Sequence, residues 1–176
     1  MNKSEVDDIL LFAESSAKLC KQNLEATNVT NKEFYLKYLA NSLYATGFFY
    51  FNKSEYPKAL EYHRRSLKIQ EEINDKMGIA ITLNDIGAVI ERQDDIPKAL
   101  EYYHKSLKID EELKNKNGIA YTLNNIGSIF DNQGDIPKAL EYYHKSLKIQ
   151  EEIMDKMGIA TSLNNIGFIY YNQGPP

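Results

Sequence analysis

Apolar positions recur at helical spacing in two separate stretches of every forty residues. In residues 118–157 the first stretch contains Leu123, Ile126, Gly127 and Phe130, and the second contains Ala139, Leu140, Tyr143 and Leu147. Steps of three and four residues place each set on one face of an α-helix. The polar segment "NQGD" between the two stretches interrupts the pattern. Each forty-residue stretch is therefore predicted to form two helices joined by a short turn.

The forty-residue pattern repeats along most of the chain. Three complete repeats occupy residues 38–77, 78–117 and 118–157, and a half repeat follows at 158–174. The segment "DIPKALEYYHKSLKI" stands unchanged at 95–109 and 135–149. A short turn makes consecutive helices antiparallel, and one hairpin cannot bury its apolar face alone. The sequence therefore predicts an all-α solenoid of stacked antiparallel helix hairpins.

Residues suited to helix starts mark the predicted boundaries. Asp95 and Asp135 each stand two residues before a proline, at the start of a second helix. A carboxylate can accept hydrogen bonds from the free N–H groups of the first turn, where proline is also tolerated. The first helices that follow are expected to be capped in the same way, by Asp75, Asn115 and Asp155.

The segment before the repeats is predicted to be one amphipathic helix. Residues 4–26 carry apolar side chains on one side, and the polar stretch "TNVTN" follows them. We expect this helix to pack on the first hairpin as a cap. The chain is thus divided into a capping helix with its linker at 1–30 and a repeat array at 31–176.

The spacing of small, apolar and aromatic residues resembles the tetratricopeptide repeat (TPR). Six positions carry the resemblance in the third repeat, and the same six recur forty residues earlier: Leu123, Gly127, Phe130, Ala139, Tyr143 and Ser146, with Leu83, Gly87, Ile90, Ala99, Tyr103 and Ser106. The forty-residue period is similar to the long-helix TPRs of Pins/LGN-type scaffolds, and "TLNNIG" is similar to "TLNNLA" of kinesin light chains. The first repeat departs from the pattern, because His63 replaces the tyrosine and "SLYATG" replaces "TLNDIG".

This resemblance implies a fold and a function. It implies a right-handed α-solenoid that binds a protein or peptide segment in its concave groove, without catalysis. Arrays of this composition look like bacterial ones, which often precede a signalling output domain. A fragment of a larger signalling protein is therefore one alternative, and a self-assembling structural module is another.

Composition and charge exclude several classes of partner. The mean hydropathy is −0.51, and the apolar runs are far shorter than the roughly 20 residues that cross a bilayer. Met1 is followed by polar residues, and Cys20 is the single cysteine, so we expect a cytoplasmic protein. The net charge of −4 comes from interspersed acids and bases, which argues against nucleic acid as a partner.

Candidate catalytic and metal-binding residues give no motif. His104 and His144 lie one repeat apart, and stacked helices are separated by about 8 to 10 Å, which is too far to share an ion. The "EE" pairs at 71, 111 and 151 stand among lysines, as in a solvated helix face. No phosphate loop, nucleophile motif or zinc spacing is present. We expect no metal, no cofactor and no enzyme activity.

The second and third repeats differ at 13 of 40 positions, and the differences are not spread evenly. The helix "DIPKALEYYHKSLKI" is unchanged. In a TPR-like stack the positions equivalent to 81, 84, 85, 88, 91 and 92 face the groove, and five of these six differ. A recognition surface would vary in this way, although drift at exposed positions of a duplicated sequence is an alternative.

The predicted peptide-binding groove consists of Tyr44, Phe48, Asn84, Asp85, Arg92, Tyr121, Asn124, Asn125, Asn164, Asn165 and Phe168. Asparagine dominates its middle. A primary amide can pair with both the N–H and the C=O of a peptide backbone, and aromatic side chains can anchor apolar groups. The resemblance implies this role for Asn84, Asn124 and Asn164. The alternative is that these amides are polar, solvated residues.

The half repeat at 158–174 carries the apolar stripe of a first helix without the second helix that covers it in earlier repeats. We expect self-association through this stripe, made of Leu163, Ile166, Ile169 and Tyr170. A symmetric copy, an exchanged terminal helix and truncation of a longer array would each account for the open stripe.

Overall fold

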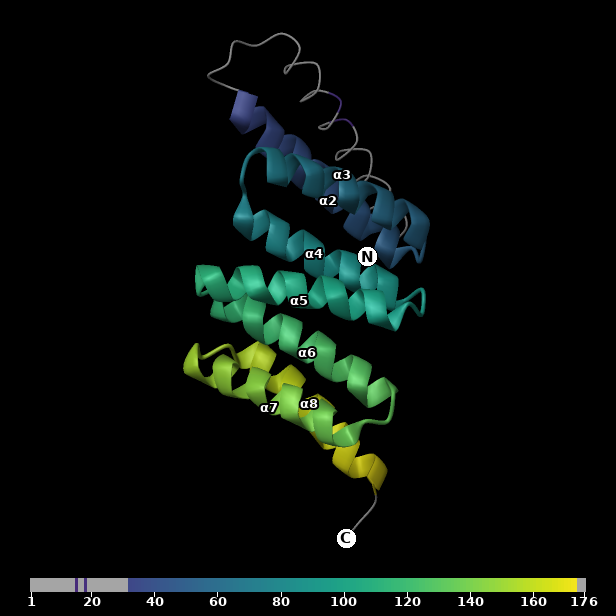
Figure 1. The fold of residues 1–176 in the computed structure, drawn as a ribbon. Helices are drawn as coiled ribbons and strands as arrows, with labels where there is room; N and C mark the ends of the chain where they lie inside the picture. The colour runs from purple at the N-terminus through teal and green to yellow at the C-terminus, as the bar shows by residue number, and fades with distance from the viewer. Residues whose placement is uncertain (1–14, 16–17, 19–31, 174–176) are drawn as a thin grey trace. The chain divides into compact units, whose positions relative to one another are not determined.

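The computed structural model describes residues 15, 18 and 32–173 of the chain, and these residues are helical apart from short turns. The predicted capping helix at 4–26 and its linker lie outside the described residues, apart from the two single positions. From residue 32 onward seven helices follow one another (Figure 1). The chain divides into two compact units, an N-terminal unit that ends at Asp95 and a C-terminal unit that begins at Ile96.

The N-terminal unit is built from three helices. They are α2 (Lys32–Asn52), α3 (Tyr56–Glu72) and α4 (Lys76–Glu91). Helix α3 packs on α2 and α4 packs on α3, so consecutive helices lie side by side (Figure 1). Three-residue connections separate them, because the helices end at 52 and 72 and restart at 56 and 76. These turns make the neighbours antiparallel, as the sequence predicts.

The C-terminal unit contains the remaining four helices. They are α5 (Ile96–Leu113), α6 (Lys116–Asn132), α7 (Ile136–Glu152) and α8 (Lys156–Gln173). Helix α6 contacts α5 and α7, and α8 contacts α7 and, less extensively, α6. A buried cluster of Ala139, Tyr143, Ile166 and Ile169 joins α7 to α8. The predicted all-α fold of stacked antiparallel pairs, a TPR-like solenoid, is confirmed. The right-handed sense of the whole array stays a prediction.

Each turn between helices uses one residue with positive φ. The six positions stand twenty residues apart, and only one of them is glycine: Ser54, Asn74, Asp94, Lys114, Gly134 and Met154. In the turn before α7 the N–H of Asp135 donates to the carbonyl of Phe130 at 2.9 Å, which closes the preceding helix in the manner of a Schellman motif. The left-handed residue therefore belongs to the turn itself, and the sequence signals it at Gly134 and, more weakly, at Asn74 and Asp94.

The helix starts follow the predicted capping in part. Asp75 accepts a hydrogen bond from the N–H of Gly78 at 3.0 Å, and Asp135 accepts one from the N–H of Lys138 at 3.3 Å. Asn115 precedes α6 but makes no such bond with its side chain. Its amide donates instead to Asp110 Oδ1 at 2.7 Å, so the expectation that Asn115 caps α6 is wrong.

Glycines on the first helices let an aromatic side chain of the next helix approach the backbone. A Cβ added to Gly127 would stand 2.7 Å from Tyr143 Cε1. In the N-terminal unit a Cβ on Gly47 would stand 2.7 Å from Nδ1 of His63, which occupies the place that tyrosine takes in later repeats. Both aromatic side chains are fully buried. The missing Cβ of each glycine therefore leaves the space that the buried ring of the next helix fills.

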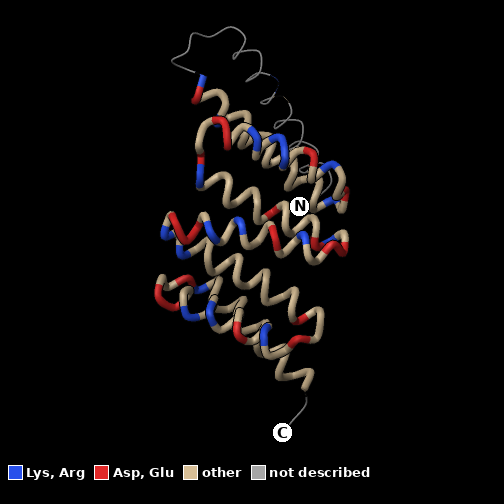
Figure 2. Tube along the Cα trace, viewed as in Figure 1, with Lys and Arg blue, Asp and Glu red and all other residues tan. Residues whose placement is uncertain are grey.

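Charged residues gather on the second helices. Lysines, arginines and carboxylates alternate along α3, α5 and α7, whereas α4, α6 and α8 carry few of them (Figure 2). Ion pairs one helical turn apart, such as Lys105 with Glu101 and Lys145 with Glu141, line the exposed faces. In residues 32–173 no helix combines the length and apolar character that crossing a membrane would require.

Candidate protein-interaction site

The predicted groove residues of the N-terminal unit come from α2, from α4 and from Arg92, which directly follows α4. Phe48 and Arg92 are exposed, and Tyr44 and Asp85 are half-buried. Tyr44 donates a hydrogen bond from its hydroxyl to Asp85 Oδ2 at 2.6 Å, which ties the two helices together. Burial raises the pKa of Asp85, and the hydrogen bond from Tyr44 partly opposes that rise. The pair places a partly desolvated carboxyl group beside an exposed aromatic ring.

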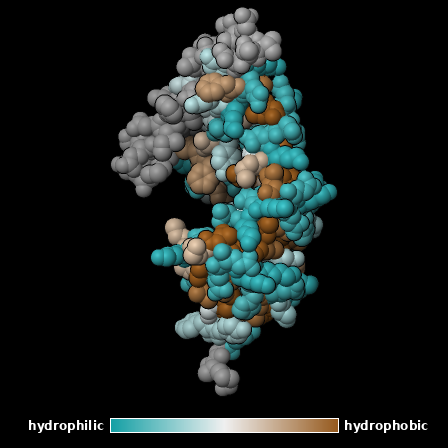
Figure 3. Space-filling view, turned by 90° about the vertical axis from the view of Figure 1, so that its left-hand side faces the viewer, coloured by the Kyte–Doolittle hydropathy of each residue, from teal (hydrophilic) through white to brown (hydrophobic). Residues whose placement is uncertain are grey.

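The predicted groove residues of the C-terminal unit come from α6 and α8. Tyr121 and Phe168 are 59% and 58% exposed, and the amides of Asn125 and Asn165 are half-buried. These four side chains combine large apolar contact areas with hydrogen-bonding groups. In the space-filling view hydrophobic residues reach the surface in places and are bordered by hydrophilic ones (Figure 3). Such a surface can hold an apolar group and a peptide backbone together.

Asn124 differs from its expected role, because it is only 8% exposed. Its Nδ2 atom donates to Ser146 Oγ on α7 and to Ser162 Oγ on α8, both at 2.8 Å. Ser146 in turn donates to the carbonyl of Ala120 at 2.7 Å, and Ser162 donates to Gln150 Oε1 at 2.7 Å. The amide thus joins three helices, and both of its hydrogens are already used.

This finding changes the predicted set of peptide contacts. Asn124 cannot offer a free amide hydrogen to a bound segment in this arrangement, and Asn84 is buried even further, at 3% exposed. Neither residue is a solvated surface amide, so the alternative interpretation is wrong for them as well. Asn164 holds the same position in α8 and is exposed. The serines at 146 and 162 are the residues that the groove analysis missed, although both recur in the sequence as serine or threonine.

The predicted self-association stripe divides into two halves. Leu163 and Tyr170 are 52% and 54% exposed, whereas Ile166 and Ile169 are buried. The two isoleucines pack with Ala139 and Tyr143 of α7, on the other side of α8. Ile166 and Ile169 are therefore core residues, and their assignment to a self-association surface is wrong.

The first repeat lacks the asparagine that links three helices by hydrogen bonds in the third repeat. Tyr44 stands where the later repeats have Asn84 and Asn124, and the buried hydroxyl of Thr82, which corresponds to Ser162, has no hydrogen-bond partner. His63 is also buried with both ring nitrogens unpaired, and its ring centre lies 5.5 Å from that of Tyr44. Burial lowers the pKa of His63 to about 4. The N-terminal unit therefore holds a neutral imidazole in its core.

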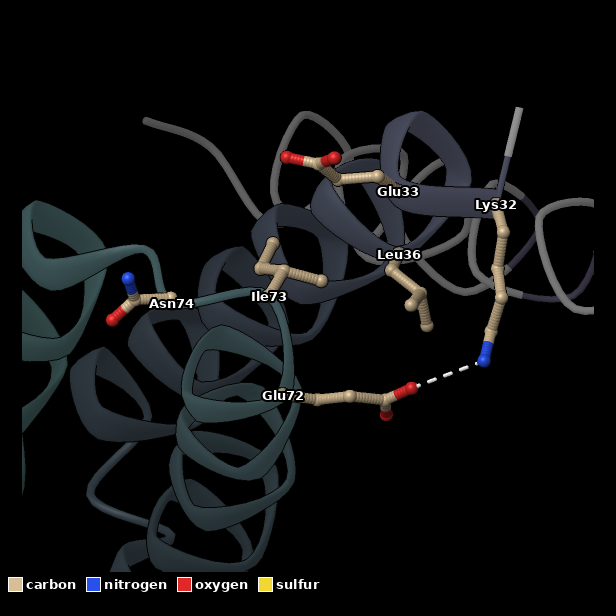
Figure 4. A pocket seen from close by; sticks show the side chains of 6 residues that line it. All are labelled: Lys32, Glu33, Leu36, Glu72, Ile73 and Asn74. Carbon is tan, nitrogen blue, oxygen red and sulfur yellow. Dashed lines mark hydrogen bonds and ion pairs between the residues drawn. The ribbon is translucent and has the colours of Figure 1, made fainter. Parts of the chain in front are cut away.

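A shallow pocket of about 370 Å³ lies at the start of α2. Figure 4 shows Leu36 and Ile73 inside it, with Lys32 reaching across to Glu72. The Lys32 Nζ and Glu72 Oε1 atoms are 3.2 Å apart, and both side chains are more than half exposed. An exposed ion pair of this kind contributes little to binding or stability. Across the described part of the chain no three His, Cys, Asp or Glu side chains gather as metal ligands would.

Solved structures of other proteins share this arrangement of stacked helices. The chain is similar to BtubC (BKLC) from P. vanneervenii, with a TM-score of 0.69 and 14% identity over 94% of this chain and 83% of that one. It is also similar to aspartyl phosphate phosphatase F from Bacillus subtilis, with a TM-score of 0.71 and 16% identity over 92% of this chain. The match spans only 44% of the phosphatase.

A third solved structure is a kinesin light chain from Podospora anserina with nearly identical TPR-like repeats. Its TM-score is 0.55 at 11% identity, over 91% of this chain and 89% of that one. At these identities the likeness shows the fold alone. No curated protein sequence matches the chain. The tetratricopeptide repeat family model, however, matches residues 38–112, 78–152 and 118–175. These matches cover most of the sequence, and the chain belongs to the tetratricopeptide repeat family.

Proposed function

We propose that the chain is a non-catalytic module that binds a protein segment on the groove faces of its first helices. TPR domains typically act in protein interaction, and no catalytic family matches this chain. The observation that carries the proposal is the exposure of aromatic residues beside amides on α6 and α8. Tyr121 and Phe168 supply apolar anchors, and Asn125 and Asn165 supply hydrogen bonds. A cytoplasmic location is part of the proposal and rests on the single cysteine, which cannot form an internal disulfide and so suits a reducing compartment.

The N-terminal unit offers a different chemistry on its groove face. Phe48 supplies an exposed ring, and Asp85 supplies a carboxyl group that already accepts a hydrogen bond from Tyr44. Arg92, the residue that directly follows α4, adds an exposed cation. The groove face of the N-terminal unit therefore offers charged groups, and that of the C-terminal unit offers neutral amides. This difference matches the positions at which the second and third repeats diverge.

The experiment compares two double variants in one capture assay from the native cell. Tyr121→Ala/Phe168→Ala removes the exposed rings of the groove face, and His104→Ala/His144→Ala changes exposed residues of the second helices. A partner that the wild type and the histidine variant retain, and the ring variant loses, supports the proposal. Calorimetry with the recovered partner then measures the loss, expected at about 2 to 4 kcal/mol for two anchor residues. Equal affinity for all three proteins contradicts groove binding.

A second candidate function is association with another chain through the open face of α8. Leu163 and Tyr170 favour it, because both are large apolar side chains that stand more than half exposed. Light scattering over a concentration series tests self-association directly. Leu163→Glu/Tyr170→Glu should then give a monomer at all concentrations, while Thr161→Glu, an exposed position on the groove face, should not change the association state.

A further inference from the structure

Helices α6 and α8 carry closely similar residues on the side that faces a following helix, but among the described residues only α6 is covered there. Both contain "LNNIG", at 123–127 and at 163–167. Leu123 is 7% exposed and Leu163 is 52% exposed. The isoleucine three residues later is buried in both helices, with Ile126 0% and Ile166 7% exposed. The large difference in exposure between Leu123 and Leu163 therefore lies on the side that faces a following helix.

Helix α7 packs on this side of α6 through three contacts. The ring of Tyr143 occupies the space above Gly127. Ser146 Oγ accepts from the Asn124 amide and donates to the carbonyl of Ala120. The rings of Tyr142 and Phe130 stack with their centres 5.5 Å apart and an angle of 11° between their planes.

The residues of α6 that make these three contacts have counterparts on α8, and no described helix covers them there. No atom of the described residues lies within 4 Å of the place that a Cβ of Gly167 would take, so the space for an aromatic ring is open. Asn164 and Ala160, which correspond to Asn124 and Ala120, are both exposed. Tyr170 corresponds to Phe130 and is 54% exposed, with its ring available for stacking. The face is thus a complete copy of a helix-binding surface.

We propose that the open face of α8 binds a helix of another chain that carries the side-chain pattern of α7. That pattern is alanine, two consecutive aromatic residues three and four positions later, and serine seven positions later, as in Ala139, Tyr142, Tyr143 and Ser146. The second aromatic ring fills the space at Gly167, and the first stacks on Tyr170. The serine bonds Asn164 and the Ala160 carbonyl. The inference rests on the second candidate function, association with another chain through the open face of α8, and names as the partner a chain of this chemistry instead of a second copy.

A second copy of α8 fits this face less well. The open side of α8 offers leucine and tyrosine, which could contact each other across two copies, but it has no serine with which to bond Asn164 and the Ala160 carbonyl. Burial of those polar groups without partners is unfavourable. The α7 pattern satisfies both groups and also places a ring over the glycine.

The probe is a synthetic peptide of residues 135–150, acetylated and amidated, titrated into the isotope-labelled full chain and followed by NMR. We expect saturable shifts confined to α8 around Leu163, Gly167 and Tyr170. Gly167→Leu fills the open space at this position without displacing any described neighbour, and should weaken binding by about tenfold or more, because overpacking prevents the close approach. Thr161→Leu is the matched control, and it should bind as the wild type does. A peptide with Tyr143→Ala should lose affinity to a similar degree.

The outcomes separate this inference from self-association. A chain that is monomeric alone and binds the peptide at α8 supports the inference and contradicts self-association. A chain that dimerises and does not exchange its partner for the peptide overturns the inference and leaves self-association standing. Absence of shifts at α8 with millimolar peptide, or equal shifts in Gly167→Leu, also overturns it.

Discussion

Tyr143 packs over Gly127 so closely that a Cβ on the glycine would stand 2.7 Å from the ring. Real side chains do not approach to this distance, so any larger residue must displace a fully buried tyrosine. We expect Gly127→Leu to destabilise the protein by about 1 to 3 kcal/mol or more. Thermal unfolding followed by circular dichroism measures the effect. Gly167→Leu is the matched control in the uncovered helix, and its melting temperature should stay close to that of the wild type.

The linkage made by Asn124 gives a second prediction. Asn124→Ala removes an amide that bonds two buried serines, and it leaves Ser146 and Ser162 each without one partner. We expect a loss of about 1 to 3 kcal/mol of unfolding free energy. Asn164→Ala changes the same residue type where it is exposed, so its effect should stay within about 0.5 kcal/mol. Urea unfolding that gives equal losses for the two variants would contradict the structural role of Asn124.

The contrast between Asn124 and Asn164 also shows which features the sequence could predict. Helical periodicity and the forty-residue repeat are local or regular signals, and they predicted the seven helices and their antiparallel stacking. Whether an asparagine is buried depends on a serine 38 residues away on a neighbouring helix, and one helix's own pattern does not contain that information. Likewise Ile166 and Leu163 look equivalent in sequence, and only the packing against α7 separates them.

The turn before α8 predicts a stabilising substitution. Met154 is exposed and has a φ of 57°, a conformation that costs a non-glycine residue about 1 to 2 kcal/mol. Gly134, at the equivalent place in the preceding turn, has a φ of 77° without this cost. Met154→Gly should therefore raise the unfolding free energy by a few tenths to about 1 kcal/mol, since the added freedom of the unfolded chain offsets part of the gain. The reverse change, Gly134→Met, should lower it, and a loss of stability in Met154→Gly would refute the argument.

The pair of buried Asp110 and half-buried Asn115 predicts a second stabilising change. Burial raises the pKa of Asp110, and the hydrogen bond from Asn115 lowers it only in part. The equivalent pairs are Gln70 with Asp75 and Gln150 with Asp155. Asp110→Gln/Asn115→Asp copies that arrangement, removes a carboxylate from the interior and restores a residue able to cap α6 as Asp75 caps α4.

The sign of the pH dependence provides the test for this pair. The folded pKa of Asp110 lies above its unfolded value. The contribution of Asp110 to the unfolding free energy is therefore most favourable in acid, and it is lost as the pH rises through the folded pKa. The double variant should therefore gain about 1 kcal/mol over the wild type at pH 7 and less at pH 4. Denaturant titrations at the two pH values measure the difference. Asp110→Gln alone removes the carboxylate and leaves the cap unchanged, so a change in stability that is the same at both pH values in this single variant would contradict the raised pKa of Asp110.

His63 predicts acid sensitivity of the N-terminal unit. It is buried with neither ring nitrogen bonded, and burial lowers its pKa to about 4, from an unfolded value near 6.5. The folded state keeps the His63 ring neutral. The unfolding free energy is therefore undiminished above the pKa that His63 has in the unfolded chain, and it falls as the pH drops from about 6.5 to about 4. The loss over this range is about 3 kcal/mol. His63→Tyr places in the first repeat the residue that Tyr103 and Tyr143 supply in the others, and it should abolish this part of the acid sensitivity. His144→Tyr, at an exposed position of α7, is the control and should leave the pH profile of the melting temperature unchanged. A wild-type profile that is flat between pH 7 and 4, or one that His63→Tyr does not alter, would contradict the buried neutral histidine.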